Sequence, residues 1–489
     1  MDDLICVFDC GTTGSRTILF NAKGIEIIRA YEEYPSERQP AGISEQDPII
    51  WWNAIKNTCN KVMKNSKINV DDIIGIAATF HRATTTIIDK DRNVLHPALT
   101  WMDEREVSDI KEFQEEGGLR RAIPKILWFK NNKPDLFNKA FKIIFPDTYI
   151  YMKLCDKIIT DPSNAIFGIL NMEDTLKWDE ELADLYELPI DLWPEIREPG
   201  TIIGELSNET ADLLGLKKNL PIIMGGGDQQ CSALGLGAIE TGQAKCTTGT
   251  GTFVDMVVDK PVEVTGDIPL FSLPHVIKGK WVVEGTIPGT GTALKWFRDN
   301  FSQLQVKQCE DAKDKNVYDE LISEAEDIPI GSEGLLFVPL YVFRKGTIHG
   351  LSFNHTRGHF IRAIMESAAL SAQMYLSLIE GVVGVKTSEI KVDGGATNSN
   401  LWCQIFADVI MKDILVPKVK DGAALGAGIL GFFGCGKYSK IDDAVENMVK
   451  VIDKKTPNKE NKKTYKKLKR IFAPVLLETL NNKRVTRNL

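Results

Sequence analysis

Short apolar runs and polar turns alternate at the start of the chain. Residues 4–9 and 17–21 have the length and apolar content of buried strands, and the glycine- and threonine-rich segment between them predicts a hairpin turn. Residues 47–66 instead carry apolar side chains at helical spacing behind an Asp-Pro start signal. Two more strand-like runs follow at 73–80 and 84–89. This order of strands and a helix is typical of an α/β lobe.

A second block of the same kind begins near residue 222. Residues 222–239 and 244–258 contain strand-like runs around glycine-rich turns, and the turn in the second segment resembles the one at the start of the chain. A helical pattern then covers 354–383, and a strand, a glycine turn and a helix follow from residue 389. We therefore predict two related lobes, at 1–240 and 241–440, and a lysine-rich helical tail at 441–489.

Composition narrows the class of protein. A chain of 489 residues, 43 % of them hydrophobic, can form two separate cores. The net charge of −8 argues against nucleic acid as a partner, because a surface that binds phosphate backbones must be basic. The nine cysteines include no CxxC pair, which favours a reducing cytoplasm over a disulfide framework or a zinc site. No apolar stretch approaches 18 residues, so we expect no membrane segment.

The first hairpin carries candidate phosphate chemistry. Its sequence, DCGTTGSR, places Asp9 at a strand end. The turn contains Thr12, Thr13 and Gly14, and its backbone N–H groups can surround phosphate oxygens. Asp9 could hold Mg²⁺ through water, and Arg16 could meet the charge of a transferring phosphoryl group. The spacing is not that of a Walker A loop, and an ordinary tight hairpin with an aspartate cap is the alternative.

A carboxylate follows three glycines at the end of another apolar strand. In GGGDQQ, residues 225–230, Asp228 is placed to accept the proton of a sugar hydroxyl, which is a weak nucleophile until that proton is removed. The alternative is an acidic N-cap of the helix that follows. We favour the catalytic interpretation because a glycine triplet has little structural use at an exposed cap.

Further polar clusters lie at strand and helix ends. TTGTGT at 247–252 is a second candidate phosphate cradle, and GGATNS at 394–399 opens a helix whose amides could face a nucleotide. Arg82 could hydrogen-bond substrate oxygens or form a surface salt bridge. Asp103 could line a pocket or pair with Arg105 for structural reasons. The candidate substrate-binding residues are His81, Arg82, Asp103, Asp228 and Gln229.

The motifs DCGTTGSR, GGGDQQ, TTGTGT and VDGGATNS, in this order, resemble those of the FGGY carbohydrate kinases. The strongest single piece is residues 346–367, which are similar to the signature of that family's second lobe, and residues 125–132 resemble its first-lobe signature. The resemblance covers roughly residues 4–440. It implies an α/β fold of two actin-like (ribonuclease-H-like) lobes with an interlobe cleft, in which the first lobe binds substrate and the second binds ATP.

The resemblance also implies roles for single residues. Asp228 and Arg16 are the implied catalytic residues, and Asp9 and Asp228 would bind Mg²⁺. Glycerol kinases usually have glutamine and asparagine where this chain has Lys295 and Ser399. The implied cofactor-binding residues are Asp9, Thr12, Thr13, Gly14, Thr250, Gly251, Gly291, Lys295, Gly395 and Ser399.

Departures from the family pattern bear on the acceptor but leave its identity open. FHRATTTIID aligns with glycerol kinases and keeps Arg82, but Ala83 stands where a glutamate would bind glycerol hydroxyls. Residues 42–52 and 398–409 look more like xylulose kinases. We therefore expect an ATP-dependent kinase of a small sugar or polyol, foremost a ketopentose such as xylulose or ribulose, with a homodimer as its candidate assembly. A glycerol kinase, an autoinducer-type kinase, an actin-like ATPase and a sugar sensor are the alternatives.

Overall fold

The computed structural model describes residues 3–35, 42–65, 68–105, 118–249, 251–264, 270–312, 316–338 and 346–481. The chain forms two compact units. The first contains Met1–Thr241, Val257–Val283 and Asp421–Lys450, and the second contains Gly242–Met256, Glu284–Lys420 and Val451–Leu489. The predicted lobe limits at 240 and 440 stay a prediction; they differ from these units because the segment that begins at Asp421 packs with the first unit.

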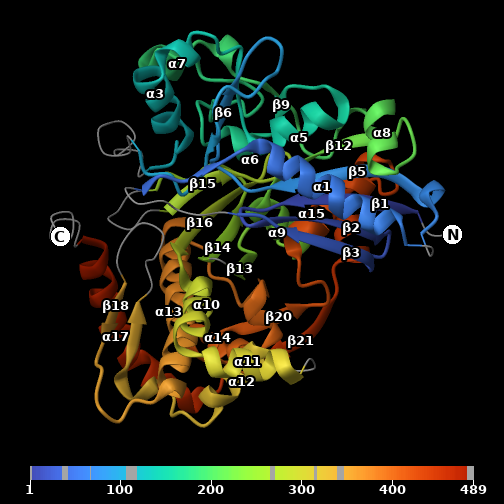
Figure 1. Ribbon diagram of the computed structural model, residues 1–489. Helices are drawn as coiled ribbons and strands as arrows, with labels where there is room; N and C mark the ends of the chain where they lie inside the picture. Colours follow the sequence, from blue (N-terminus) through green and yellow to red (C-terminus); the bar gives the residue numbers. More distant parts are fainter. Residues whose placement is uncertain are drawn as a thin grey trace. The chain divides into compact units, whose positions relative to one another are not determined.

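The first unit is built on a six-stranded sheet with the order β11-β12-β5-β1-β2-β3 (Figure 1). Strands β1, β2 and β3 form an antiparallel meander, and β5 runs parallel to both β1 and β12. The predicted first hairpin is thereby confirmed. The strand bounds are β1 Leu4–Cys10, β2 Gly14–Asn21, β3 Glu26–Glu33, β5 Ile73–Phe80, β11 Ile202–Glu205 and β12 Pro221–Gly227.

Helices cover both faces of this sheet, which explains why every residue of β1 is buried. Helix α1, Pro48–Met63, packs on β2 and β3, and Cys6 and Phe8 belong to the same hydrophobic core as its apolar side. Helix α15, Gly422–Gly434, packs on β1, β5 and β12. Side chains alternate along a strand, so β1 presents its even-numbered residues to α1 and its odd-numbered residues to α15.

Helices α9, Asp228–Gly235, and α15 approach each other until their backbones touch. A Cβ atom on Gly235 would lie 1.9 Å from the carbonyl oxygen of Gly422, and one on Gly426 would lie 1.8 Å from that of Cys231. Only glycine fits at these contacts. The glycines of α15 therefore fix the position of the helix that begins with Asp228.

The rest of the first unit is mainly helical and surrounds a second apolar core. This core contains Phe129, Phe145 and Trp193, with partly buried side chains packed around it. Helices α5 and α6 both contact strand β12. The helices are α3 Ala122–Asn132, α4 Pro134–Phe137, α6 Pro162–Ala165 and α7 Glu180–Tyr186, together with α5 Pro146–Cys155 and α8 Asn208–Leu214, whose buried apolar side chains belong to the first core.

The second unit contains most of a seven-stranded sheet with the order β15-β16-β14-β13-β19-β20-β21. Strand β13 forms an antiparallel hairpin with β14 and runs parallel to β19, just as β1 pairs with β2 and β5. The predicted second hairpin is confirmed. The strands are β13 Ala244–Thr248, β14 Gly251–Val258, β15 Leu270–Pro274, β16 Trp281–Pro288, β19 Glu389–Asp393, β20 Asp413–Pro417 and β21 Val451–Lys455.

Long helices pack beside this sheet. The predicted helix at 354–383 is α13, Arg357–Val383, and it packs against α14, Asn400–Ile410. The C-terminal helix α17, Lys462–Asn481, exposes its lysines, yet it buries Tyr465, whose hydroxyl donates to Glu366 at 3.0 Å. The last segment is thus packed into the second unit along one face.

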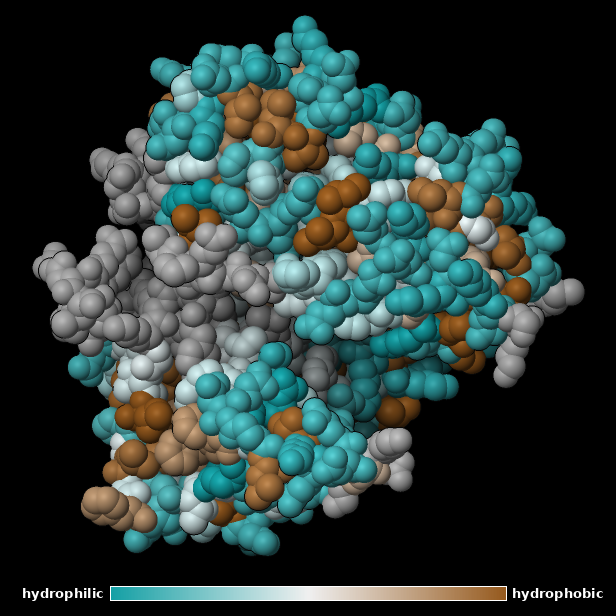
Figure 2. All heavy atoms as spheres, in the orientation of Figure 1, coloured by the Kyte–Doolittle hydropathy of each residue, from teal (hydrophilic) through white to brown (hydrophobic). Residues whose placement is uncertain are grey.

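Hydrophilic side chains cover most of the face shown in Figure 2, and the hydrophobic patches on it are small and separate. Within the part of the chain that the structure describes, none of the helices is long and apolar enough to cross a membrane.

Candidate functional site

The first hairpin places an acidic side chain directly opposite a basic one. Asp9 and Arg16 are paired across β1 and β2, and Arg16 Nε lies 3.4 Å from Asp9 Oδ2. The other end of the same guanidinium pairs with Asp421, whose Oδ2 atom also lies 3.7 Å from Arg29 Nη1. Arg16 is therefore held between two carboxylates.

Burial raises the pKa of Asp9 to about 7, because its side chain has lost most of its water. The Arg16 cation opposes this shift, while the nearby carboxylates of Asp421 and Asp228 add to it. A divalent cation would offset the same burial and repulsion, so the residues present fit Mg²⁺. No group of three or more histidine, cysteine, aspartate or glutamate side chains able to hold a metal occurs among the described residues. Mg²⁺ often takes only one or two carboxylates and completes its shell with water and phosphate.

Asp421 is a site residue that the sequence analysis missed. It stands at the N-cap position of α15, yet its side chain makes no capping hydrogen bond and instead meets Arg16. The Asp-Gly pair before an alanine- and glycine-rich stretch could have predicted a helix start. No local signal connects it to an arginine 405 positions earlier.

The turn of this hairpin is tied to its surroundings. Thr12 accepts a hydrogen bond from Trp101 Nε1 at 2.9 Å through its hydroxyl, and one from Gln46 Nε2 at 2.8 Å through its carbonyl. Thr13 is exposed, and Gly14 begins β2 and is buried. The Thr13 carbonyl also accepts the Tyr34 N–H at 3.0 Å, so both threonines of the predicted phosphate turn are anchored, and only Thr13 has an exposed side chain.

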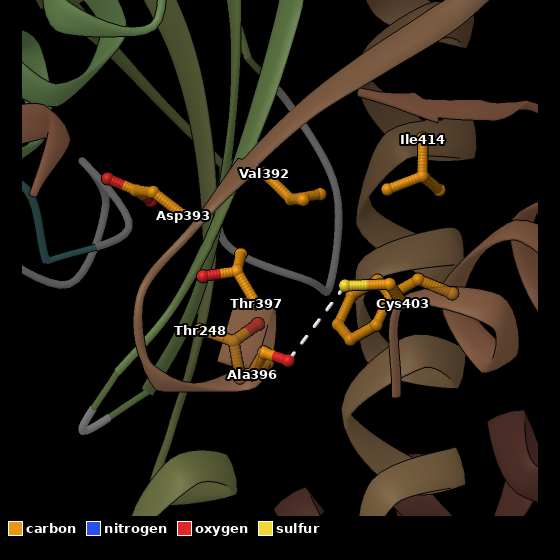
Figure 3. A pocket seen from close by; sticks show the side chains of 8 residues that line it. Thr248, Val392, Asp393, Ala396, Thr397, Cys403 and Ile414 are labelled. Atoms are coloured by element: carbon orange, nitrogen blue, oxygen red, sulfur yellow. Dashed lines mark hydrogen bonds between the residues drawn. The ribbon is translucent and has the colours of Figure 1, made fainter. Parts of the chain in front are cut away.

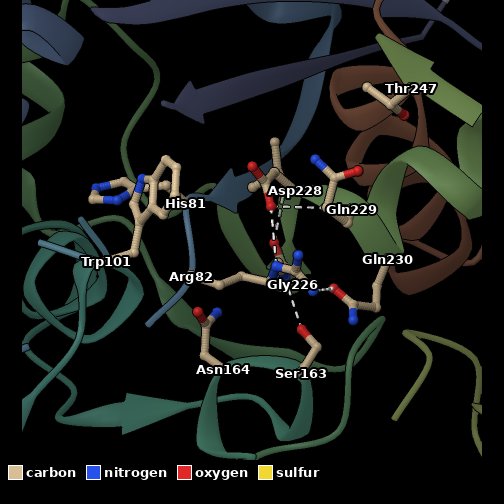
Figure 4. A network of polar contacts seen from close by, with 12 residues as sticks. His81, Arg82, Trp101, Ser163, Asn164, Gly226, Asp228, Gln229, Gln230 and Thr247 are labelled. Atoms are coloured by element: carbon tan, nitrogen blue, oxygen red, sulfur yellow. Dashed lines mark hydrogen bonds and ion pairs between the residues drawn. The ribbon is translucent and has the colours of Figure 1, made fainter. Parts of the chain in front are cut away.

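Asp228 is the first residue of α9, directly after β12 (Figure 4). Its Oδ1 atom lies 3.3 Å from Arg82 Nε and accepts the backbone N–H of Gln229 at 2.8 Å. One third of the Asp228 side chain is exposed, whereas Arg82 is almost fully buried. The structure therefore brings together three of the predicted substrate residues: Asp228, Arg82 and Gln229.

The Arg82 side chain is held along its whole length. Its Nη1 atom donates to Gln230 Oε1 at 3.2 Å, and its guanidinium lies 5.4 Å from the ring centre of Phe167. A Cβ atom on Gly227 would come within 2.6 Å of Arg82 Cδ. Arg82 is thus a fixed cation beside Asp228. It does form an ion pair, but not the surface salt bridge considered as its alternative, because the arginine itself is buried.

The reason given for favouring a catalytic Asp228 was also wrong. The glycine triplet has a clear structural use, since a Cβ on Gly225 would lie 1.6 Å from the carbonyl oxygen of Ala78, and one on Gly226 would lie 2.4 Å from Val276. Strand β12 packs too closely for any other residue. The case for Asp228 now depends on its exposure and on its partner Arg82.

The other two predicted substrate residues have different surroundings. His81 is buried, its Nδ1 atom lies 3.0 Å from the Thr84 hydroxyl, and burial together with the charge of Lys125 lowers its pKa to about 3. Asp103 accepts two side-chain N–H groups of Arg105, the nearer at 2.8 Å, and the backbone N–H of Ser44 at 2.8 Å. The structure thus shows His81 as a neutral side chain and Asp103 in the structural pairing that the sequence left open.

Lys125 fixes the turn that carries Arg82. Its Nζ atom donates to the carbonyl oxygen of Ala83 at 2.6 Å, and Ala83 has a left-handed backbone with φ of 59°. Burial lowers the pKa of Lys125 to about 7, against the opposing effect of Asp103. The first-lobe signature thus contacts the strand end where the substrate residues lie.

The second hairpin offers hydroxyls in place of charges at its turn. Thr252 lies 2.8 Å from the Thr290 hydroxyl at the start of α10, Thr290–Phe301. A Cβ atom on Gly291 would lie 1.4 Å from the Gly249 carbonyl oxygen, so this helix start touches the turn. Gly251 begins β14, and Thr250 lies outside the described residues.

A small pocket lies at the end of the same sheet (Figure 3). Gly395 faces open space there, and Ser399 caps α14 by accepting the Trp402 N–H at 3.1 Å. Lys295 is exposed on α10 and pairs with Asp299 at 3.1 Å. The pocket is lined by Thr248, Val392, Asp393, Ala396, Thr397, Cys403, Phe406 and Ile414.

Relatives with three different names match almost the whole chain. A xylulose kinase from Bacillus subtilis (strain 168) is 26 % identical over 493 residues, which is 96 % of each protein. A glycerol kinase from Thermococcus gammatolerans is 29 % identical over 478 residues, 92 % of this chain and 93 % of the relative. A gluconokinase from Bacillus licheniformis is 28 % identical over 491 residues, 95 % of this chain and 94 % of the relative.

Solved structures match the fold. The ligand-bound xylulose kinase from Lactobacillus acidophilus has a TM-score of 0.85 at 23 % identity, and the match covers 98 % of this chain and 99 % of that one. Plasmodium falciparum glycerol kinase with ADP has a TM-score of 0.78 at 22 % identity and covers 97 % and 98 %. The predicted two-lobed α/β fold class is confirmed.

Family matches extend over both units. Residues 4–235 match the N-terminal domain of the FGGY family of carbohydrate kinases, and residues 244–435 match its C-terminal domain. The resemblance drawn from four short motifs is thereby confirmed, and with it an enzyme that uses ATP. The chain belongs to the FGGY family of carbohydrate kinases.

Proposed function

We propose that this carbohydrate kinase transfers the γ-phosphoryl group of Mg·ATP to a hydroxyl of a ketopentose such as xylulose or ribulose, with Asp228 as the base. The observation that carries the proposal is the part-exposed Asp228 carboxylate, fixed at a strand end by Arg82. A carboxylate in this setting can accept a hydroxyl proton as the oxygen attacks phosphorus. Arg82 and Gln229 would orient the acceptor beside it.

The charged hairpin supports the phosphoryl group. Arg16 is fixed by Asp9 and Asp421, so it can stabilise developing negative charge without first changing its own position. Asp9, with Asp228, would hold Mg²⁺, which when bound neutralises phosphate charge and aligns the transferring group. These roles use the residues that the sequence singled out, together with Asp421.

The predicted nucleotide residues outside the first hairpin belong to the second unit. The backbone of the β13–β14 turn, with Gly251 and the helix start at Gly291, would bind phosphates through N–H groups. Gly395 and Ser399 would lie near the adenosine, because Gly395 has open space above it. Lys295 is exposed and can leave Asp299 to reach a nucleotide.

The acceptor assignment depends on Ala83. Its methyl group is buried and its carbonyl is used by Lys125, so neither can replace the glutamate that would bind glycerol. The named relatives divide among xylulose, glycerol and gluconate kinases. A screen of ADP release with xylulose, ribulose, glycerol and gluconate, compared as kcat/KM, tests this assignment. A preference for glycerol would overturn the use made of Ala83.

The assignment of the base is tested by Asp228→Asn. We expect kcat to fall at least about 100-fold, because general-base catalysis contributes about 10²–10⁴-fold, while ATP binding by equilibrium dialysis stays near that of the native protein. Near-normal turnover would reject Asp228 as the base. The homodimer and the cytoplasmic location stay predictions from the sequence.

A further inference from the structure

The last residues of β12 follow an irregularity in its pairing with β5, after which Gly226 pairs with Thr79 and Gly227 with Phe80. The register shifts between Ile223 and Gly226, just before the strand ends and α9 begins with Asp228. Side-chain hydroxyls bind the backbone groups of this segment. Gly225 N–H donates to the Tyr151 hydroxyl at 2.9 Å, and Gly227 N–H donates to Ser163 Oγ at 2.8 Å.

A third hydroxyl completes the set. Thr79 Oγ1, on β5, donates to the carbonyl oxygen of Gly226 at 3.0 Å. The three hydroxyl-bearing residues are almost fully buried and come from β5, α5 and α6. Each glycine of the triplet therefore has one backbone group held by a side chain from a different element.

The hydrogen-bond direction at Ser163 is determined by its neighbour. Ser163 Oγ donates to Asp161 Oδ2 at 2.5 Å, so its lone pairs are left to accept the Gly227 N–H. Asp161 is itself fixed, because it also accepts the Ser163 backbone N–H at 2.8 Å and Asn164 Nδ2 at 2.9 Å. A chain of hydrogen bonds thus runs from the buried Asp161 carboxylate through Ser163 to Gly227, the residue directly before Asp228. Figure 4 shows Ser163 beside this strand end.

We propose that Ser163, Tyr151 and Thr79 are positioning residues that set the place of the Asp228 carboxylate. The glycines let the strand end pack closely, but they give it no stiffness of their own. The three hydroxyls supply that stiffness. Ser163 has the most direct effect, because it binds the N–H of Gly227, the residue directly before Asp228. This inference rests on the proposed role of Asp228.

The test uses Ser163→Ala and Tyr151→Phe, each of which removes one hydroxyl. We expect kcat to fall about 10- to 100-fold, because a displacement of about 1 Å at a reacting group can cost that much, while KM for ATP stays within about twofold. The rates are measured with whichever of xylulose, ribulose, glycerol and gluconate the native protein phosphorylates fastest. If Ser163→Ala does not fold, Tyr151→Phe alone decides the question, since it keeps the ring.

Thr58→Val is the matched control. The Thr58 hydroxyl is also buried in the first unit, where it lies 2.8 Å from the Thr17 hydroxyl and donates to the Ala54 carbonyl at 2.7 Å. We expect this variant to lose thermal stability to a similar extent while kcat stays within about twofold. An equal loss of kcat in the control and in Ser163→Ala would overturn the proposal.

A double variant separates positioning from general damage. If Ser163 acts through Asp228, adding Ser163→Ala to Asp228→Asn should lower the residual rate by less than about twofold, because the carboxylate that it places is already gone. A full further loss in that background contradicts the proposal. Native-like activity of Asp228→Asn itself would instead reject the proposed base, so the two failures are distinguishable.

Discussion

The two glycine- and threonine-rich hairpins share a topology and differ in where they keep their charges. In each, the first strand pairs antiparallel with the second and parallel with a third strand. In β1–β2 the Asp9–Arg16 pair is one rung from the last pair before the turn. In β13–β14 the charged pair is Lys245 and Asp255, three rungs from the end, and it is fully buried.

This difference indicates a division of labour. Charge beside the turn is available to a metal ion and a phosphoryl group, as we propose for the first hairpin. The second hairpin keeps its ion pair inside the sheet, where Lys245 Nζ also donates to the Thr247 hydroxyl at 3.0 Å. Its last strand pair, Thr248 and Thr252, carries no charge, and we propose that this end of the hairpin binds phosphates that are not transferred. Under the proposed roles, one scaffold would serve chemistry in the first unit and binding in the second.

The largest expected effect is that of Arg16→Gln. This change removes a fixed cation from the first hairpin, and losing one preorganised donor typically costs about 10²–10³-fold in kcat. Steady-state kinetics with saturating Mg·ATP measure it. Arg16→Lys should recover only part of the rate, because an ammonium group cannot span Asp9 and Asp421 as the guanidinium does. If Arg16→Gln kept native kcat, the charge of Arg16 would have no role in catalysis.

Breaking the ion pair of the second hairpin should lower the unfolding free energy of the protein. Lys245→Met leaves Asp255 buried without its cation, and breaking a buried ion pair in this way costs about 3–5 kcal/mol of unfolding free energy. Urea unfolding measures the loss. Replacing both residues, as Lys245→Met with Asp255→Leu, should restore most of it because no lone charge stays in the core. A Lys245→Met protein of native stability but low kcat would contradict the division of labour.

The smallest expected effect is on how the unfolding free energy depends on pH, measured without Mg²⁺ and ATP. Burial raises the folded-state pKa of Asp9 to about 7 from its ordinary value of 3.8. Between about pH 4 and pH 7 the folded chain therefore holds a proton that the unfolded chain has lost, so stability should fall as pH rises through this range. Asp9→Asn should remove part of that fall, measured by urea unfolding at pH 5 and pH 8. Asp147, whose pKa burial also raises to about 7, contributes to the slope in both proteins. If the unfolding free energy of the variant depended on pH just as that of the native protein does, burial would not raise the pKa of Asp9.

The sequence predicted the parts of the molecule that depend on local pattern. The two hairpins and the long helix α13 follow from runs of apolar residues, and the strand end before Asp228 follows from a glycine signal. The contacts that hold Asp228 could not be predicted in this way. Ser163 meets Gly227 across 64 positions and Arg16 meets Asp421 across 405, and a single sequence gives no information on which distant segments touch.

The glycine triplet shows how a prediction can be drawn from an incorrect reason. Three glycines before an acid were expected to have little structural use, which favoured a catalytic role for the acid. Their contacts show close packing of β12 against β5 and Arg82. The same residue type serves both purposes, and only the position of the neighbouring backbone distinguishes them.

The close contact between α9 and α15 has a consequence for synthesis of the protein. Helix α15 belongs to the segment Asp421–Lys450, so the first unit receives one of its two covering helices only after residues 284–420 have been made. Until then, the odd-numbered side chains of β1 and the glycine face of α9 have no partner, and the nascent first unit exposes apolar surface. Folding of the first unit must therefore wait for the second to leave the ribosome, although its own strands are made first.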